Sequence, residues 1–303
     1  MNEKRPAPHK QHPGKQHRSH AGRRDPRPYQ IAVLSSLAVY AIFGLDFDVR
    51  PPVALAAVTA ALLSQAILGR WAKLPRPLDL RSALISSLSL ILLLRAASPT
   101  LAALTGLLAI SSKFVLRFQG RHLFNPTALA LAVMSVVSDG VWISPGQWGA
   151  AAIFAFTAAA AGVLVVHRAE RADITFAFLG SFTLLVLARA AWLGDPPAIP
   201  LHQLTSGSLL VFSFFMISDP KTTPASRLGR VVFAALVATV ALVIQFGFYR
   251  ANGPIYALVL CAPLVPLLDR FLPGTAYNWP GARDTITLQS SPSPRKEASP
   301  CVS

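Results

Sequence analysis

The chain alternates between long apolar stretches and short polar segments, a pattern typical of proteins that cross a membrane several times. A hydrocarbon core of about 30 Å, at 1.5 Å per helical residue, requires roughly 20 residues. Ten stretches approach this length. The predicted spans are 29–45, 52–70, 80–97, 99–116, 123–138, 147–166, 173–192, 203–218, 228–248 and 253–271. The pattern therefore predicts an all-α polytopic membrane protein with about ten transmembrane helices.

Two of these spans contain unusually short apolar cores. One core covers residues 82–94 and the other lies within 203–218, and each carries small hydroxylated residues at its start. Ser87 and Gly207, near the two starts, are 120 positions apart (207 − 87). Paired short or broken helices in corresponding halves of a membrane protein point to a binding site.

The ten spans divide into two groups of five, repeat one at 29–138 and repeat two at 147–271. An odd number of spans in each repeat places the second copy upside down in the membrane. Asn125-Pro126 opens the fifth span and Asn252-Gly253-Pro254 opens the tenth, which supports the division. The same residues also suit ordinary helix starts. The predicted fold is a five-plus-five inverted repeat with paired short helices.

The composition excludes a soluble domain, because 53% of the 303 residues are hydrophobic and only 14% are charged. The net charge of +15 does not indicate a nucleic-acid partner, since the basic residues lie in a tail and in short loops. Twelve Lys and Arg residues fall in the loops predicted to be inside, against four outside. This bias predicts an inner-membrane protein with both termini in the cytoplasm and lipid as its surroundings.

The two ends of the chain differ in composition from the transmembrane domain at 29–271. Residues 1–28 are basic and hold four of the seven histidines, and we expect a disordered cytoplasmic tail facing anionic lipid. No cleaved signal peptide is expected there. Residues 272–303 predict a flexible tail. Cys261 and Cys301 form no metal-binding pattern, so no metal site is expected.

No nucleophile–base set, phosphate loop or pair of membrane carboxylates is present, so no catalytic residue is expected. Polar groups instead gather near the two short spans, where hydroxyl and backbone groups suit a neutral or delocalised ligand. The same hydroxyls can also bond to their own helix or join neighbouring helices. The candidate binding residues are Ser82, Ser86, Ser87, Asn125, Ser206, Gly207, Ser208, Asp219 and Lys221. The last two either contact a ligand or neighbouring subunit, or only cap and neutralise their loop.

Several segments together resemble the NqrB/RnfD family. They are Asp79-Leu80-Arg81-Ser82-Ala83-Leu84-Ile85-Ser86, Lys113 followed by Phe124-Asn125-Pro126, and Phe214-Phe215-Met216-Ile217-Ser218-Asp219-Pro220-Lys221-Thr222. That family comprises the flavin-carrying membrane subunits of the sodium-pumping NADH:quinone oxidoreductase and of the Rnf electron-transport complex. The resemblance covers about 79–270. It implies the ten-helix inverted repeat, electron transfer through a flavin, and partner subunits in a redox complex.

The chain departs from the family pattern after the fifth span. Family members carry there a Ser-Gly-Ala-Thr type motif whose threonine holds FMN through a phosphoester bond, whereas residues 138–147 form only a brief connection. Covalent FMN is therefore not expected, and the resemblance still implies FMN or riboflavin held without a covalent bond. The predicted function is an RnfD/NqrB-like electron-transport subunit whose electron transfer is coupled to ion transport. The alternative is a transporter or channel for a small neutral solute.

Overall fold

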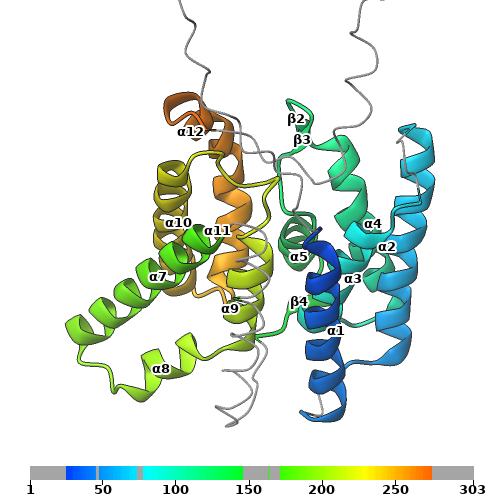
Figure 1. Ribbon diagram of the computed structural model, residues 1–303. Helices are drawn as coiled ribbons and strands as arrows, with labels where there is room; N and C mark the ends of the chain where they lie inside the picture. The colour runs from blue at the N-terminus through cyan, green and yellow to red at the C-terminus, as the bar shows by residue number, and fades with distance from the viewer. Residues whose placement is uncertain (1–24, 46–47, 74–77, 146–162, 164–170, 275–303) are drawn as a thin grey trace, which may run out of the picture. The chain divides into compact units, whose positions relative to one another are not determined.

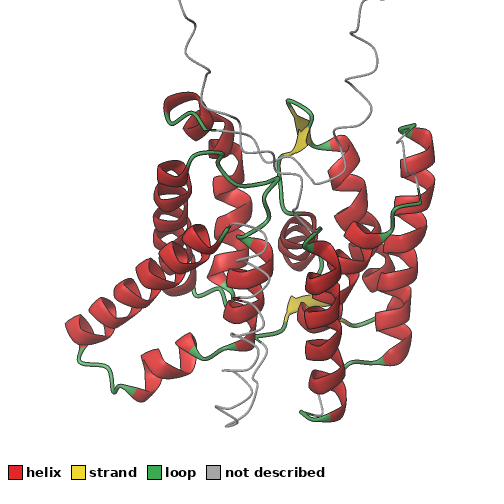
Figure 2. Cartoon of the chain, in the orientation of Figure 1, coloured by secondary structure: helices red, strands yellow, loops and turns green. Residues whose placement is uncertain are grey.

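The computed structural model describes residues 25–45, 48–73, 78–145, 163 and 171–274 (Figure 1). Within these ranges the apolar stretches are helices, and strands are confined to two short ribbons (Figure 2). The predicted span 147–166 lies almost wholly outside the described residues, as do residues 1–24 and 275–303 of the two tails.

The first half of the described chain contains five helices whose starts follow from the sequence. Pro lies in the first turn of four of them, where a missing N–H costs nothing. The side chains of Ser98 and Asn125 accept hydrogen bonds from main-chain N–H groups three residues later, which caps two helices. The five are α1 (Arg27–Phe43), α2 (Pro51–Trp71), α3 (Arg81–Leu93), α4 (Pro99–Val115) and α5 (Pro126–Val137).

The second half is more irregular, because several of its helices are broken or widened. Two of them end in a π-helical turn, and the last one passes through a 3₁₀ turn at Pro263. Such widened turns recur at functional sites. The elements are α7 (Ala172–Leu193), α8 (Ala198–Leu204), α9 (Gly207–Val211) with η1 (Phe212–Met216), α10 (Arg227–Leu242) with η2 (Val243–Gly247), α11 (Gly253–Cys261), η3 (Ala262–Leu264) and α12 (Val265–Phe271).

Length and composition identify the membrane-crossing helices among the described residues. Four are long and apolar enough: Pro51–Trp71, Ala172–Leu193, Arg227–Gly247 and Gly253–Phe271. A fifth candidate is the pair α8 and α9–η1, which is bent by 43° at its break. Three shorter apolar helices, α3, α4 and α5, accompany them. The protein is therefore a helical, multi-pass membrane protein, as the apolar pattern predicts.

The surface confirms that this fold is adapted to lipid. Large apolar side chains on the outward faces of the long helices are exposed, including Leu55, Ile67 and Leu184, which are 66%, 62% and 69% exposed. A soluble protein rarely leaves so many in contact with water. Small residues make the close contacts between helices instead: Gly106 of α4 packs against the main chain of α2 at Ala57.

Two short antiparallel ribbons complete the fold. Strand β1 (Leu94–Ala96) continues directly from α3 and pairs with β4 (Val141–Ile143), which follows α5. Strand β2 (Arg117–Phe118) pairs with β3 (Arg121–His122) between α4 and α5. Backbone polar groups at membrane depth must be satisfied by protein. The β1–β4 ribbon does this where the first short helix ends.

Candidate functional site

The first short helix, α3, carries three of the predicted binding serines, and two of these bond to their own helix. Ser86 Oγ donates to the carbonyl of Ser82 at 3.2 Å, and Ser87 Oγ donates to the carbonyl of Ala83 at 2.9 Å. Both serines are buried. Such bonds satisfy a hydroxyl inside an apolar bundle. They leave these two hydroxyls serving the helix itself.

Ser82, at the start of α3, takes part in a contact among three helices. Lys113 Nζ, in the last turn of α4, donates to Ser82 Oγ at 2.9 Å and to Gln65 Oε1 of α2 at 3.0 Å. A charged group in an apolar bundle requires such partners. Lys113, quoted above as part of the family resemblance, therefore holds α2, α3 and α4 together at one end.

The second group of predicted residues begins α9. Ser206 occupies the N-cap position without a side-chain cap bond, and Gly207 is the first helical residue. The main-chain N–H of Ser208 donates to the carbonyl of Pro145 at 3.0 Å, just after β4. Because β4 pairs with β1 at the far end of α3, Ser208 lies near the end of that helix, whereas Ser82 lies at its start. The two serine groups are thus at opposite ends of α3 and do not form one site.

Asn125 connects the start of α5 with the end of the second short helix. Its Oδ1 accepts from the N–H of Ala128 at 3.1 Å, which caps α5, and its Nδ2 donates to the carbonyl of Met216 at 3.3 Å. A π-helical turn such as η1, ending at Met216, leaves carbonyls that need partners outside the helix. The buried amide of Asn125 supplies one, so the two halves of the chain meet here.

Arg121, three residues before Phe124, bonds four times to the second half. Its guanidinium donates to the carbonyls of Pro220, Lys221 and Thr223 at 3.4, 3.2 and 2.8 Å, and to Asp269 Oδ2 at 3.2 Å. The sequence shows Arg121 only as one of the inside charges. The one local signal for its role is its position before Phe-Asn-Pro, since a loop that opens a half-helix is also a natural contact.

Asp219 and Lys221, the last two predicted residues, lie in the loop that Arg121 holds. Asp219 Oδ1 accepts from the N–H of Lys221 at 3.0 Å, and Asp219 Oδ2 is 3.5 Å from His122 Nε2. Burial by itself raises the pKa of Asp219, but His122 and the N–H of Lys221 outweigh it and lower that pKa. Burial lowers the pKa of Lys221, and Asp219 opposes that shift. Asp219 is therefore an ionised carboxylate that orders its loop.

Arg121, His122, Asn125, Asp219 and Lys221, together called the Arg121 cluster, leave little free volume. The cavity beside them, lined in part by Asp269, measures about 30 Å³, enough for a water molecule and far too small for a ring system. The predicted site residues thus divide: Asn125, Asp219 and Lys221 meet in the cluster, Ser82 bonds to Lys113, and the others lie elsewhere.

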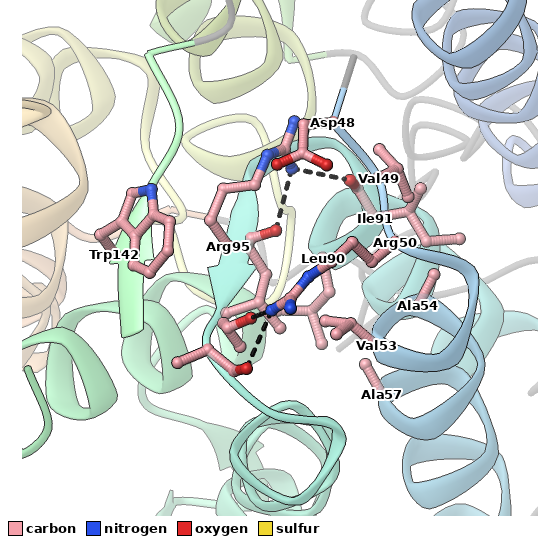
Figure 3. A pocket seen from close by; sticks show the side chains of 13 residues that line it. Asp48, Val49, Arg50, Val53, Ala54, Ala57, Leu90, Ile91, Arg95 and Trp142 are labelled. Carbon is pink, nitrogen blue, oxygen red and sulfur yellow. Dashed lines mark hydrogen bonds between the residues drawn. The ribbon is translucent and has the colours of Figure 1, made fainter. Parts of the chain in front are cut away.

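A ligand-sized cavity lies instead between the start of α2, the end of α3 and the β1–β4 ribbon (Figure 3). Its volume is about 360 Å³, within the range of small-molecule sites, which is roughly 300–1,000 Å³. We call it the Arg50 pocket. Its lining residues are Asp48, Val49, Arg50, Val53, Ala54, Ala57, Leu90, Ile91, Leu94, Arg95, Ala96, Ala97 and Trp142.

The polar groups of the Arg50 pocket are positioned by the main chain. Arg50 Nη2 donates to the carbonyls of Ala96 and Ala97. Arg95 Nη1 donates to the carbonyl of Leu94 at 2.9 Å, and Asp48 lies beside its guanidinium (Figure 3). Arg95 and Trp142 are partners across the ribbon, so their side chains share its more exposed face. The sequence shows both arginines only as outside charges, because the pairing of β1 with β4 is long-range.

Comparison with known proteins identifies the second half of this chain. Residues 138–278 match the model of the NQR2, RnfD, RnfE family. This half of the chain belongs to that family. The matched segment includes α9, η1 and the Asp219 loop, so the NQR2, RnfD, RnfE signature contains one side of the Arg121 cluster.

Curated relatives within the NQR2, RnfD, RnfE group agree, and all three named here are RnfD subunits of an ion-translocating oxidoreductase complex. The chain is 31% identical to the Vibrio atlanticus protein over 116 residues, which are 38% of this chain and 33% of the relative. It is 34% identical to that of Escherichia coli K12 over 140 residues, 45% and 35% of the two chains. It is 38% identical to that of Tolumonas auensis over 82 residues, 27% and 23%. The chain thus spans about a third or less of the length of the curated relatives it matches.

Proposed function

We propose that this chain is an integral membrane electron-transport subunit of the RnfD/NqrB type, working in a multi-subunit, ion-translocating oxidoreductase complex. The observation that carries the proposal is the family match over 138–278, which includes the ordered Asp219 loop. The names of the relatives describe subunits of such a complex. The partners are then the other subunits and the surrounding lipid, and the membrane is the inner membrane.

The fold behind this proposal is a five-plus-five inverted repeat, and the packing of the described helices supports it. Helix α2 packs extensively against α4, and α7 against α10 in the same way; α4 meets α5 as α10 meets α11. The amides are also reciprocal: Asn125 reaches Met216 in the second half, and Asn252 Nδ2 donates to the carbonyl of Ile143 at 3.0 Å. Ile143 in turn pairs with Leu94 at the end of α3. Each half closes on the broken element of the other.

The proposed cofactor is a flavin, FMN or riboflavin, held without a covalent bond. The Arg50 pocket fits such a group, since it combines a volume of about 360 Å³, apolar walls from α2 and α3, guanidinium donors and the indole of Trp142. A bound flavin supplies one- and two-electron transfer, and the protein supplies position and electrostatics. Arg50 and Arg95 are the side chains expected to hold its polar end, and Trp142 offers an aromatic surface. The serines of α3 and α9 line neither this pocket nor the small one.

A flavin spectrum of the purified protein tests the proposal. We expect protein purified in mild detergent to carry a flavin absorption band close to one equivalent, and acid precipitation to release all of it into the supernatant. Flavin fluorescence that stays on the protein band of a denaturing gel would contradict the non-covalent assignment. A colourless protein that equilibrates a neutral solute across liposomes would replace the redox function with transport, the alternative that paired short helices also fit.

The proposed orientation places both termini in the cytoplasm, because of the excess of basic residues in the inside loops. Reporter fusions after Lys73, Arg117 and Arg227 are expected to report cytoplasm, and fusions near Gly140 and Gly194 the opposite side. Paired alkaline phosphatase and fluorescent protein fusions at each point measure this. An outside signal after Arg227 would remove the inverted repeat, because that loop must lie on the same side as Arg117.

A further inference from the structure

The donors of the Arg50 pocket are unusual for the start of a helix. Helix α2 begins with Pro51-Pro52, which have no N–H, and the next two N–H groups, of Val53 and Ala54, both donate to the carbonyl of Arg50. The helix start therefore presents no free main-chain donors to an anion. Hydrogen-bond donors at this end come instead from guanidinium groups.

Arg50 keeps donors in reserve. Both of its hydrogen bonds within the described residues leave from Nη2, toward the carbonyls of Ala96 and Ala97, so Nε and Nη1 remain for another acceptor. The two carbonyls fix the guanidinium plane against the ribbon. A fixed planar fork matches the oxygens of a phosphate or carboxylate better than a mobile ammonium group does.

The charges of the pocket favour an anion. Arg50 and Arg95 face a single acidic residue, Asp48, which leaves one net positive charge among the lining residues. The start of α2 adds the positive end of its helix dipole. Two guanidinium groups beside an apolar bundle are costly without counter-charges. A further anion would complete the balance.

The rest of the lining is apolar. Val53, Ala54 and Ala57 on α2 and Leu90 on α3 form a wall below the two arginines, as Figure 3 shows. Trp142, 52% exposed, stands at the side of the pocket (Figure 3). Tryptophan is enriched at the boundary between lipid and water. A ligand that fills this space has a charged head and an apolar body.

We propose that the Arg50 pocket binds a phosphate-bearing amphiphile, with its phosphate held by Arg50 and Arg95 and its apolar part along α2 and α3. Two sources share this chemistry: the headgroup of an acidic phospholipid and the phosphate of FMN. The flavin source rests on the proposed function. The lipid source is independent of it, so a protein that carries no flavin still tests the pocket.

The test uses the full-length protein in neutral detergent, with native mass spectrometry and thermal unfolding as readouts. The probes are short-chain phosphatidylglycerol, FMN, riboflavin and inorganic phosphate. We expect phosphatidylglycerol or FMN to bind and raise the unfolding temperature, and inorganic phosphate at equal concentration to have no effect. In the double variant Arg50→Gln with Arg95→Gln, the apparent Kd rises by about tenfold or more.

Two further variants separate binding from folding. Arg189→Gln is the matched control: Arg189 bonds to Asp195 at 3.0 Å and lies over the ring of Phe246 at 3.8 Å, and it does not line the pocket. It is expected to change the Kd less than about twofold, since it removes a cation remote from the ligand. Ala54→Leu fills the pocket while keeping both arginines, and it is expected to weaken both amphiphiles without loss of monodisperse elution.

Four outcomes would overturn the inference. They are unchanged binding of both amphiphiles in the double variant, equal weakening by Arg189→Gln, a shift with inorganic phosphate as large as with phosphatidylglycerol, and riboflavin binding as tightly as FMN with no lipid bound. Competition between FMN and phosphatidylglycerol would place both in this one pocket. Binding of lipid alone would support the pocket while leaving the flavin to a different site.

Discussion

Gly106→Ala is expected to lower the stability of the folded protein by about 1–3 kcal/mol, the usual cost of overpacking a close contact. A Cβ atom at this position would overlap the carbonyl oxygen of Ala57 on α2. That oxygen belongs to the main chain, so it cannot turn aside as a side chain would, and α2 and α4 must separate. Unfolding by a denaturing detergent, followed by circular dichroism, measures the loss.

Gly180→Ala is the matched control, since it makes the same change within an equally apolar helix, α7. A Cβ at Gly180 meets no atom within 4 Å, so only the helix preference of alanine remains. We expect a gain of about 0.5–1 kcal/mol or no change. Equal stabilities of the two variants would mean that α2 and α4 do not pack at Gly106.

Arg121→Gln is expected to destabilise the protein by about 2–3 kcal/mol and to loosen the Asp219 loop. The change removes the donors that hold three carbonyls of residues 220–223, and it leaves Asp269 without its cation. Asp269 Oδ1 also accepts from the N–H of Ala225 at 2.7 Å, so the loss extends to the next turn. Limited proteolysis of this loop, together with thermal unfolding, measures both effects.

Arg117→Gln serves as its control, because Arg117 lies in the same β2–β3 ribbon. It is exposed, and its side chain donates to the carbonyl of Gly120 at 2.9 Å. We expect a change within about 0.5 kcal/mol, as for most exposed charges. If both arginine variants unfold alike, Arg121 does not join the two halves.

The positions of the helices can be predicted because apolar length is a strong signal. The short helix at 82–94, for example, appears as α3, over Arg81–Leu93. Its continuation as strand β1 cannot be predicted, since that strand depends on a partner nearly fifty residues later. Contacts between distant segments depend on the packed fold, and no local pattern encodes them.

The site can be predicted only in part. Asn125 and Asp219 stand out because they lie in distinctive segments at helix ends, and both make the contacts of such positions. The serines of α3 and α9 suggest a shared site by their matching sequence, yet in an inverted repeat the starts of equivalent helices lie at opposite ends. Arg50 and Arg95 carry no local motif, and only the β1–β4 ribbon places them in one pocket.

The reciprocal amides have a mechanical consequence. Asn125 is tied to Met216 at one end of the short helices, and Asn252 is tied to Ile143 near the other. A rocking motion of one half against the other, the usual way in which inverted repeats alternate access, would stretch one of these ties in either direction. Ion passage coupled to electron transfer is therefore expected to depend on local movements, such as rearrangement of the π-helical turns, rather than on rotation of whole halves.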